Sequence, residues 1–153
     1  MDDRTVHRAF RALLLAHAYP GRVQPGPAPR AGEVLELLEE AVWADAPRPP
    51  VLLGPGDATA ELEAAGCGTE LEPELGATVV RLVQPGGPSV RVVLEGPGVD
   101  GRLETSLPCS RPELEARDRA CAGYPLGIDL VFLDPDGGIQ ALPRTTRVRA
   151  VEK

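Results

Sequence analysis

The stretch Gly127-Ile128-Asp129-Leu130-Val131-Phe132-Leu133 is followed by Asp134-Pro135-Asp136-Gly137-Gly138 and then by Ile139-Gln140-Ala141-Leu142. The first run is apolar at all but one interior position, which is typical of a buried strand. Asp, Pro and Gly in close succession are typical of a tight turn. Residues 127–142 therefore predict two consecutive strands of a buried sheet, and a further strand is predicted from Arg147.

Upstream, helical stripes of apolar residues alternate with short strand patterns. A first helix is predicted from Asp2 or Asp3, as its N-terminal cap, to the stop at Pro20-Gly21, and a second short helix is predicted to reach Trp43. The stripe of the first helix is formed by Val6, Phe10, Leu13, Leu14 and His17. The stripe of the second is formed by Val34, Leu35, Leu38 and Val42.

The middle of the chain predicts a crossover unit and a hairpin. Residues 49–53 read as a short strand, and Asp57 is expected to cap a helix that runs to Gly66. Residues 77–83 and 89–95 are β-rich runs on either side of the turn 84–88, which predicts an antiparallel hairpin. Ser110 is expected to cap a charged helix that ends near Gly123.

The length and the order of elements predict the architecture. A chain of 153 residues fits one domain, residues 1–153, which is large enough to bury a core. Helices mixed with strands and ending in consecutive strands predict an α/β class, a three-layer α/β/α sandwich around a mixed sheet.

Composition excludes several classes of partner and compartment. The formal net charge of −7 argues against a nucleic-acid partner, because the phosphate backbone is repelled. Three cysteines at uneven spacing, Cys67, Cys109 and Cys121, match neither a disulfide framework nor a metal knuckle, which favours a reducing compartment. The acidic start and the short apolar run 13–15 predict neither a secretory signal nor a membrane span, so we expect a cytoplasmic protein with no membrane partner.

Two glycine-rich motifs are weak candidates for anion or nucleotide binding. Residues 96–101 spell GxGxxG after a strand, but the segment 102–108 alternates as an edge strand would and shows no helical stripe. We therefore expect a turn there. Gly54-Pro55-Gly56-Asp57 precedes a helix and suits an anion better, although Asp57 is itself expected to occupy that helix end.

Asp129 is the most unusual carboxylate, because it stands in an otherwise apolar strand. A buried unpaired ion is costly, so a partner is expected, and Arg144 on the neighbouring strand is the natural one. Asp129 could serve as a general acid or base, but half of a structural pair is the favoured interpretation. His7 and His17 lie about 15 Å apart along one helix and are not expected to share a metal.

Positive charge gathers at the end of this acidic chain. Arg144, Arg147, Arg149 and Lys153 follow one another there, with the Thr145 and Thr146 hydroxyls beside them. These residues suit a triphosphate or an acidic partner surface. The alternative, an edge strand whose charges discourage pairing with other sheets, is equally favoured.

Several motifs together resemble the PhnH subunit of the bacterial carbon–phosphorus lyase system. They are Phe10-Arg11-Ala12-Leu13-Leu14 with its stop Tyr19-Pro20-Gly21, Gly76-Ala77-Thr78-Val79-Val80, Leu94-Glu95-Gly96-Pro97-Gly98-Val99, and Tyr124-Pro125-Leu126-Gly127-Ile128-Asp129-Leu130 with Pro143-Arg144-Thr145-Thr146. The resemblance spans the whole chain but departs between Gly21 and Gly76, where the family carries a longer segment.

The resemblance implies a fold similar to the large domain of pyridoxal-phosphate transferases. It does not imply that cofactor, because the only lysine is Lys153, the last residue, and a Schiff base needs a buried amine. No cofactor, metal or catalytic residue is expected. We expect Gly127, Asp129, Pro143, Arg144, Thr145 and Thr146 to form an interface or ligand motif.

The function implied is support of a transferase complex. The resemblance implies a subunit that assists transfer of ribose triphosphate from ATP to methylphosphonate, with PhnG, PhnI, PhnJ and PhnL as partner subunits and a homodimer when isolated. The shortened middle leaves an alternative, a stand-alone paralogue that binds a small phosphorylated ligand. A third interpretation makes the chain a transferase with Asp129 as its own acid or base.

Overall fold

The computed structural model describes residues 3–44, 46, 50–54, 56–64, 78–122 and 127–151. Its helices are α1 (Asp3–Ala18), α2 (Ala31–Leu38), which continues as the π-helical turn η1 (Glu39–Trp43), α3 (Thr59–Ala64) and α4 (Arg111–Ala120). Its strands are β1 (Val51–Leu53), β2 (Thr78–Leu82), β3 (Val90–Glu95), β4 (Leu103–Leu107), β5 (Asp129–Leu133), β6 (Ile139–Leu142) and β7 (Arg147–Ala150).

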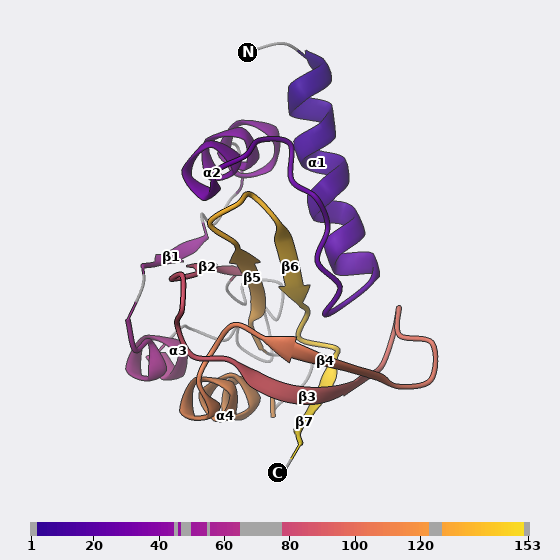
Figure 1. Ribbon diagram of the computed structural model, residues 1–153, viewed down its shortest axis with the longest axis vertical. Coiled ribbons are helices and arrows are strands. Elements are labelled where there is room, and N and C mark those ends of the chain that lie inside the picture. Colours follow the sequence, from indigo (N-terminus) through magenta and orange to yellow (C-terminus); the bar gives the residue numbers. More distant parts are fainter. Residues whose placement is uncertain are drawn as a thin grey trace.

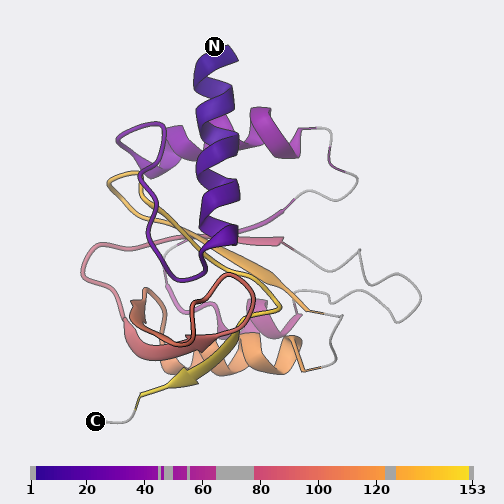
Figure 2. The same cartoon turned by 90° about the vertical axis from the view of Figure 1, so that its right-hand side faces the viewer.

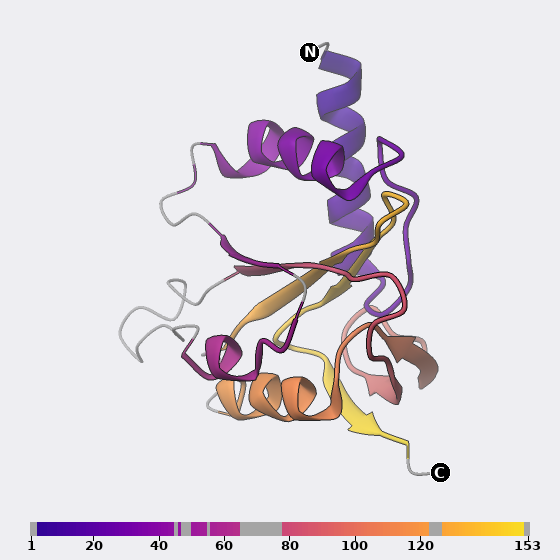
Figure 3. The same cartoon turned by 60° about the vertical axis from the view of Figure 1, so that its left-hand side comes forward.

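The larger sheet is mixed and has helices on both faces. Its order is β1-β2-β5-β6, with β1, β2 and β5 parallel and β6 antiparallel to β5. Figure 3 shows α1 and α2 on one side of this sheet and α3 and α4 on the other. The predicted α/β class and the mixed sheet are confirmed, as are the crossover unit from β1 through α3 to β2 and the strand pair 129–142.

Covering both faces explains the continuous apolar runs of β2 and β5. Val80, Val131 and Leu133 face the core beneath α1 and α2. Val79, Leu130 and Phe132 face the opposite core, which also contains residues of α3 and α4. Neighbouring residues of one strand point to opposite faces, so a strand between two helical layers buries adjacent apolar residues.

A smaller antiparallel sheet corrects the predicted hairpin. β3 does not pair with β2; it lies between β4 and β7 in a three-stranded sheet. The turn at 85–86 is present, but β2 and β3 leave it for different sheets. β3 carries Val92 and Leu94 into the core, while its alternate residues are more exposed, which suits a sheet covered on one face only. Figure 1 shows this sheet beside α4 and below β5 and β6.

The first helix buries a different face from the one predicted. Its buried residues are Ala9, Ala12, Leu13 and Ala16, whereas Phe10 is 46% and Leu14 57% exposed. Small side chains let the helix approach the sheet closely, so the alanine face packs inward and the larger residues on the neighbouring face stay outside. Figure 2 shows α1 lying across the sheet.

The proline-rich segment after α1 covers the open edge of β6. Gln24 forms a bridge with Ile139, with N–H···O distances of 2.7 and 2.8 Å, and the Gly21 N–H donates to the Ala141 carbonyl at 3.0 Å. The buried Gln140 side chain donates to the Gly21 carbonyl at 2.8 Å. An edge whose backbone groups are already satisfied is protected from pairing with another sheet.

No helix in the part of the chain that the structure describes is long and apolar enough to cross a bilayer.

Candidate functional site

The predicted motif residues meet where β5 begins and β6 ends. Asp129 accepts hydrogen bonds from the Arg144 backbone N–H at 2.8 Å and from its Nε at 3.3 Å, and Arg144 Nη2 lies 3.2 Å from Asp129 Oδ2. The predicted pairing of Asp129 with Arg144 is therefore confirmed. Both side chains are mostly buried, at 25% and 16% exposed, so the carboxylate gains the partner that its position in an apolar strand requires.

A tight turn links β6 to β7 and carries the rest of the motif. The Thr146 N–H donates to the Pro143 carbonyl at 3.0 Å, which closes the turn. Gly127 approaches it with a φ of +152°, and a Cβ there would lie 3.1 Å from the Arg144 Cβ and 3.0 Å from Cys121 Sγ. A glycine is required at this position both for its backbone conformation and for the close approach.

Arg117 of α4 holds this turn from the other side. Its guanidinium donates through Nη2 to the Pro143 carbonyl at 2.6 Å and to the Thr146 carbonyl at 3.0 Å, and through Nη1 to Asp118 at 3.0 Å. Arg117 was not among the residues predicted from the sequence to form this motif. The available signal was its helical spacing, four residues after the buried Glu113 and three after Leu114, which places it on the inward face of α4.

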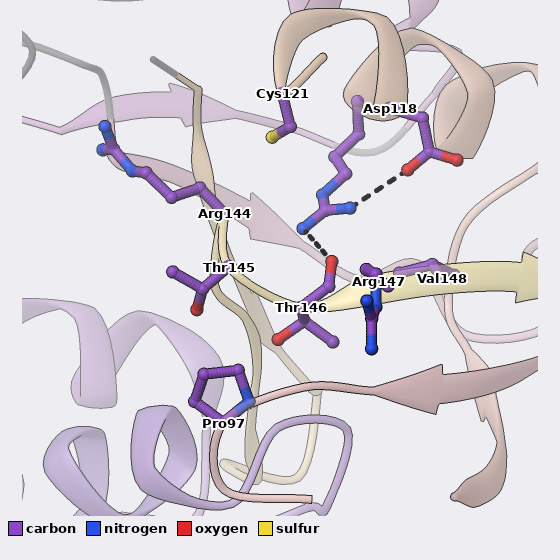
Figure 4. A pocket seen from close by; sticks show the side chains of 9 residues that line it. Pro97, Asp118, Cys121, Arg144, Thr145, Thr146, Arg147 and Val148 are labelled. Carbon is purple, nitrogen blue, oxygen red and sulfur yellow. Dashed lines mark hydrogen bonds and ion pairs between the residues drawn. The ribbon is translucent and has the colours of Figure 1, made fainter. Parts of the chain in front are cut away.

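An open hollow of about 520 Å³ lies between α4, the turn and the end of β3. It is lined by Pro97, Arg117, Asp118, Cys121, Arg144, Thr145, Thr146, Arg147 and Val148. Figure 4 shows Asp118 and Cys121 on α4 on one side of Thr146, with Pro97 on the opposite side. The motif residues Arg144, Thr145 and Thr146 line this hollow, and Arg147 joins them.

The charges around the hollow are mainly positive but are not isolated. Arg117, Arg144 and Arg147 line it together with a single carboxylate, that of Asp118. Burial raises the pKa of Asp118, although its hydrogen bond and charge interaction with Arg117 oppose that rise. Arg147 lies 3.6 Å from Glu95 in an exposed ion pair, which contributes little stability. Arg149 lies on exposed β7, and Lys153 lies outside the described residues.

A second buried ion pair lies at the carboxyl end of β2. Arg81 Nη1 is 3.0 Å from Glu113 Oε2, and Arg81 Nη2 donates to the Gly56 carbonyl. Glu113 also accepts the backbone N–H groups of Ala58 at 3.0 Å and Ser110 at 2.8 Å. The pair ties three segments together, so it fixes the structure and leaves no carboxylate oxygen free for chemistry.

Both glycine-rich candidates are structural. Residues 96–101 form turns that lead directly into β4, as predicted, and no helix follows them. Gly98 has a φ of +83°, and a Cβ there would lie 2.1 Å from the Ala18 carbonyl oxygen, so this glycine serves contact with the end of α1. Asp57 accepts from the Thr59 N–H at 3.1 Å and from its hydroxyl at 2.6 Å, and the helix α3 has only six residues.

The remaining candidates show no catalytic arrangement among the described residues. No group of three or more His, Cys, Asp or Glu side chains in that part of the chain is placed to hold a metal. His17 Nδ1 lies 2.9 Å from the Leu13 carbonyl oxygen. Cys109 and Cys121 are free thiols, and burial raises the pKa of Cys109 to about 12. Cys67 lies outside the described residues.

Comparison with known proteins gives the same family as the motifs. No curated protein sequence matches the chain. A family profile described as "Bacterial phosphonate metabolism protein (PhnH)" matches residues 28–149, which include β5, β6, the Asp129–Arg144 pair and every residue that lines the hollow. Most of the chain is matched, and the chain therefore belongs to the PhnH family and has a role in bacterial phosphonate metabolism.

Proposed function

We propose that the chain is a non-catalytic subunit of the carbon–phosphorus lyase complex. In this role it supports transfer of ribose triphosphate from ATP to methylphosphonate, in the cytoplasm, beside PhnG, PhnI, PhnJ and PhnL. Membership of the PhnH family supports a role in phosphonate metabolism. The supporting role rests on one observation: Asp129, the strongest acid–base candidate, is committed to Arg144 through both of its oxygens.

The Asp129–Arg144 pair fixes the turn 143–146 as part of a surface. A carboxylate that accepts a backbone N–H and an arginine at once is held in one fixed geometry. It is therefore better suited to hold Thr145 and Arg144 at defined positions than to exchange protons. Thr145 is exposed at the tip of this turn, where a partner subunit can reach it.

Exposed apolar side chains on another face agree with an assembly role. Phe10 and Leu14 are one helical turn apart on α1 and are about half exposed, and Tyr19 and Val23 are similarly exposed beyond it. Such groups of large apolar residues are more often found at protein contacts than on isolated monomers. Homodimer formation by the isolated chain, and a likeness to the large domain of pyridoxal-phosphate transferases, remain predictions.

Co-purification tests the proposal. A tagged chain is expressed together with PhnG, PhnI, PhnJ and PhnL, and the purified material is analysed by quantitative mass spectrometry. We expect the partner subunits in fixed stoichiometric ratio to the chain. A Thr145→Arg variant should reduce their recovery, whereas Ser89→Arg, at an exposed loop position, should not. Recovery of the tagged chain alone would refute the assembly role.

The hollow favours a second candidate, a stand-alone protein that binds a small phosphorylated ligand. A hollow of about 520 Å³ with three arginines on its lining needs no partner subunit to bind an anion. This candidate predicts ligand binding and no fixed partner. Stoichiometric co-purification with the lyase subunits would exclude it.

A further inference from the structure

Two buried polar atoms at the hollow have no hydrogen-bond partner among the described residues. They are Arg117 Nε and Thr146 Oγ1. Each residue is only 2% exposed, so bulk water does not compensate them freely. A buried polar atom left without a partner is destabilising, so such atoms are rare in proteins and require an explanation.

The surroundings of these atoms show which kind of group would satisfy them. Arg117 already donates to two carbonyl oxygens and to Asp118, so it can offer only a further N–H. The Thr146 hydroxyl can donate as well. Figure 4 shows the hydroxyl groups of Thr145 and Thr146 directed toward the space beside Pro97, with the Arg147 side chain next to them. The groups offered to a ligand are therefore mostly donors and cations, and the matching ligand is an acceptor with negative charge.

The number of donors and the volume narrow the ligand class. Arginines and hydroxyl groups together suit a tetrahedral oxyanion, which presents several acceptor oxygens and up to two charges. The volume of about 520 Å³ falls within the usual range for small-molecule sites and leaves room for an organic group attached to the anion. A monovalent carboxylate would use fewer of these donors.

We propose that this hollow is a binding site for a phosphate or phosphonate group, with the Thr146 hydroxyl as a direct donor and Arg117 and Arg147 as its positive charges. The proposal stands on the isolated chain's own contacts and does not depend on the assembly role. Binding by the isolated chain and co-purification with partners are separate measurements, so either can fail while the other holds.

Calorimetric titration of the purified chain tests the site. The probes are methylphosphonate, inorganic phosphate and ATP, with acetate and with sodium chloride at matched ionic strength as controls. We expect saturable binding of at least one phosphorus oxyanion and at least tenfold weaker binding of acetate. Preference among the three probes distinguishes a free phosphonate, a free phosphate and a nucleotide as the source of the group. No saturable binding by any of them, or binding of acetate that is as tight, would overturn the proposal.

Substitutions locate the site. Thr146→Val keeps the shape and removes the hydroxyl, and it should weaken oxyanion binding at least tenfold, while Arg147→Gln should weaken it about fivefold. Arg91→Gln, an exposed arginine on β3 outside the hollow, should bind like the parent. Equal binding by Thr146→Val and the parent would contradict the assignment.

Stability without ligand provides a readout that does not depend on binding. Since the Thr146 hydroxyl has no partner in the described residues, Thr146→Val should unfold at the same or a higher urea concentration than the parent. A clear loss of stability would mean that the hydroxyl has a structural role, and the proposal would then be wrong.

Discussion

Asp129 and Arg144 hold each other in one geometry where β5 begins and β6 ends. A carboxylate in an apolar strand requires a cation or several donors, and the strand order placed Arg144 opposite it. The burial of Arg117 was not predicted, because arginine in a charged helix is usually solvent-exposed. Only its helical spacing from Glu113 indicates that it lies on the inward face of α4. The pairing of Asp129 with Arg144 was therefore predicted, and the contact of α4 with the 143–146 turn was not.

Substitution of Asp129 distinguishes a structural role from catalysis. Asp129→Asn keeps the size but removes the charge that Arg144 requires, so we expect the free energy of unfolding to fall by about 1–3 kcal/mol in urea denaturation. Glu104→Gln, in an exposed ion pair with Arg91, should cost no more than about 1 kcal/mol. An unchanged midpoint combined with loss of activity in the assembled complex would instead assign Asp129 to the chemistry.

The Cys109 thiol should be inert in the folded protein. Burial raises its pKa from 9.0 to about 12, so the reactive thiolate is scarce at pH 8, and the side chain is also inaccessible. We expect peptide mass spectrometry after treatment with iodoacetamide at pH 8 to find Cys109 unmodified in buffer and modified in urea. Rapid modification in buffer would show that the core around Cys109 opens.

Among the elements, the positions of the strands were predicted better than the pairing between strands. The runs that became β2 and β3 are separated by a turn that suits a hairpin, and local turn chemistry cannot tell which sheet each strand joins. The sequence pattern distinguishes them, since β2 has the adjacent apolar residues Val79 and Val80 whereas β3 alternates more nearly, as parallel and antiparallel strands do. The helix α1 was placed correctly, but its alanine face packs inward because close approach to the sheet outweighs side-chain size.

The contact between the turn 96–101 and the end of α1 can be tested with two glycines. Gly98→Ala must accommodate a positive φ and also displace the Ala18 carbonyl, whereas Gly101→Ala has the same backbone demand and nothing within 4 Å of the new Cβ. We expect Gly101→Ala to cost about 1 kcal/mol and Gly98→Ala roughly 1–3 kcal/mol more in urea denaturation. Equal costs would show that the turn does not pack against α1.

The described elements assemble into layers around the larger sheet. Two helical layers enclose the mixed sheet, the proline-rich segment covers one edge, and the small sheet carries the basic strand β7. The buried Arg81 and Glu113 form an ion pair, and the buried Arg117 pairs with the more exposed Asp118. Such a molecule is suited to position other subunits and to hold a ligand for them.

In the proposed function, the chain supports a reaction that it does not itself catalyse. The most direct measurement is release of adenine from ATP in the presence of methylphosphonate, followed by chromatography, for the chain alone and for the partner subunits with and without it. We expect no release by the chain alone and a strong loss of release when it is omitted from the complete set. Adenine release by the isolated chain, or full activity of the partners without it, would contradict the account.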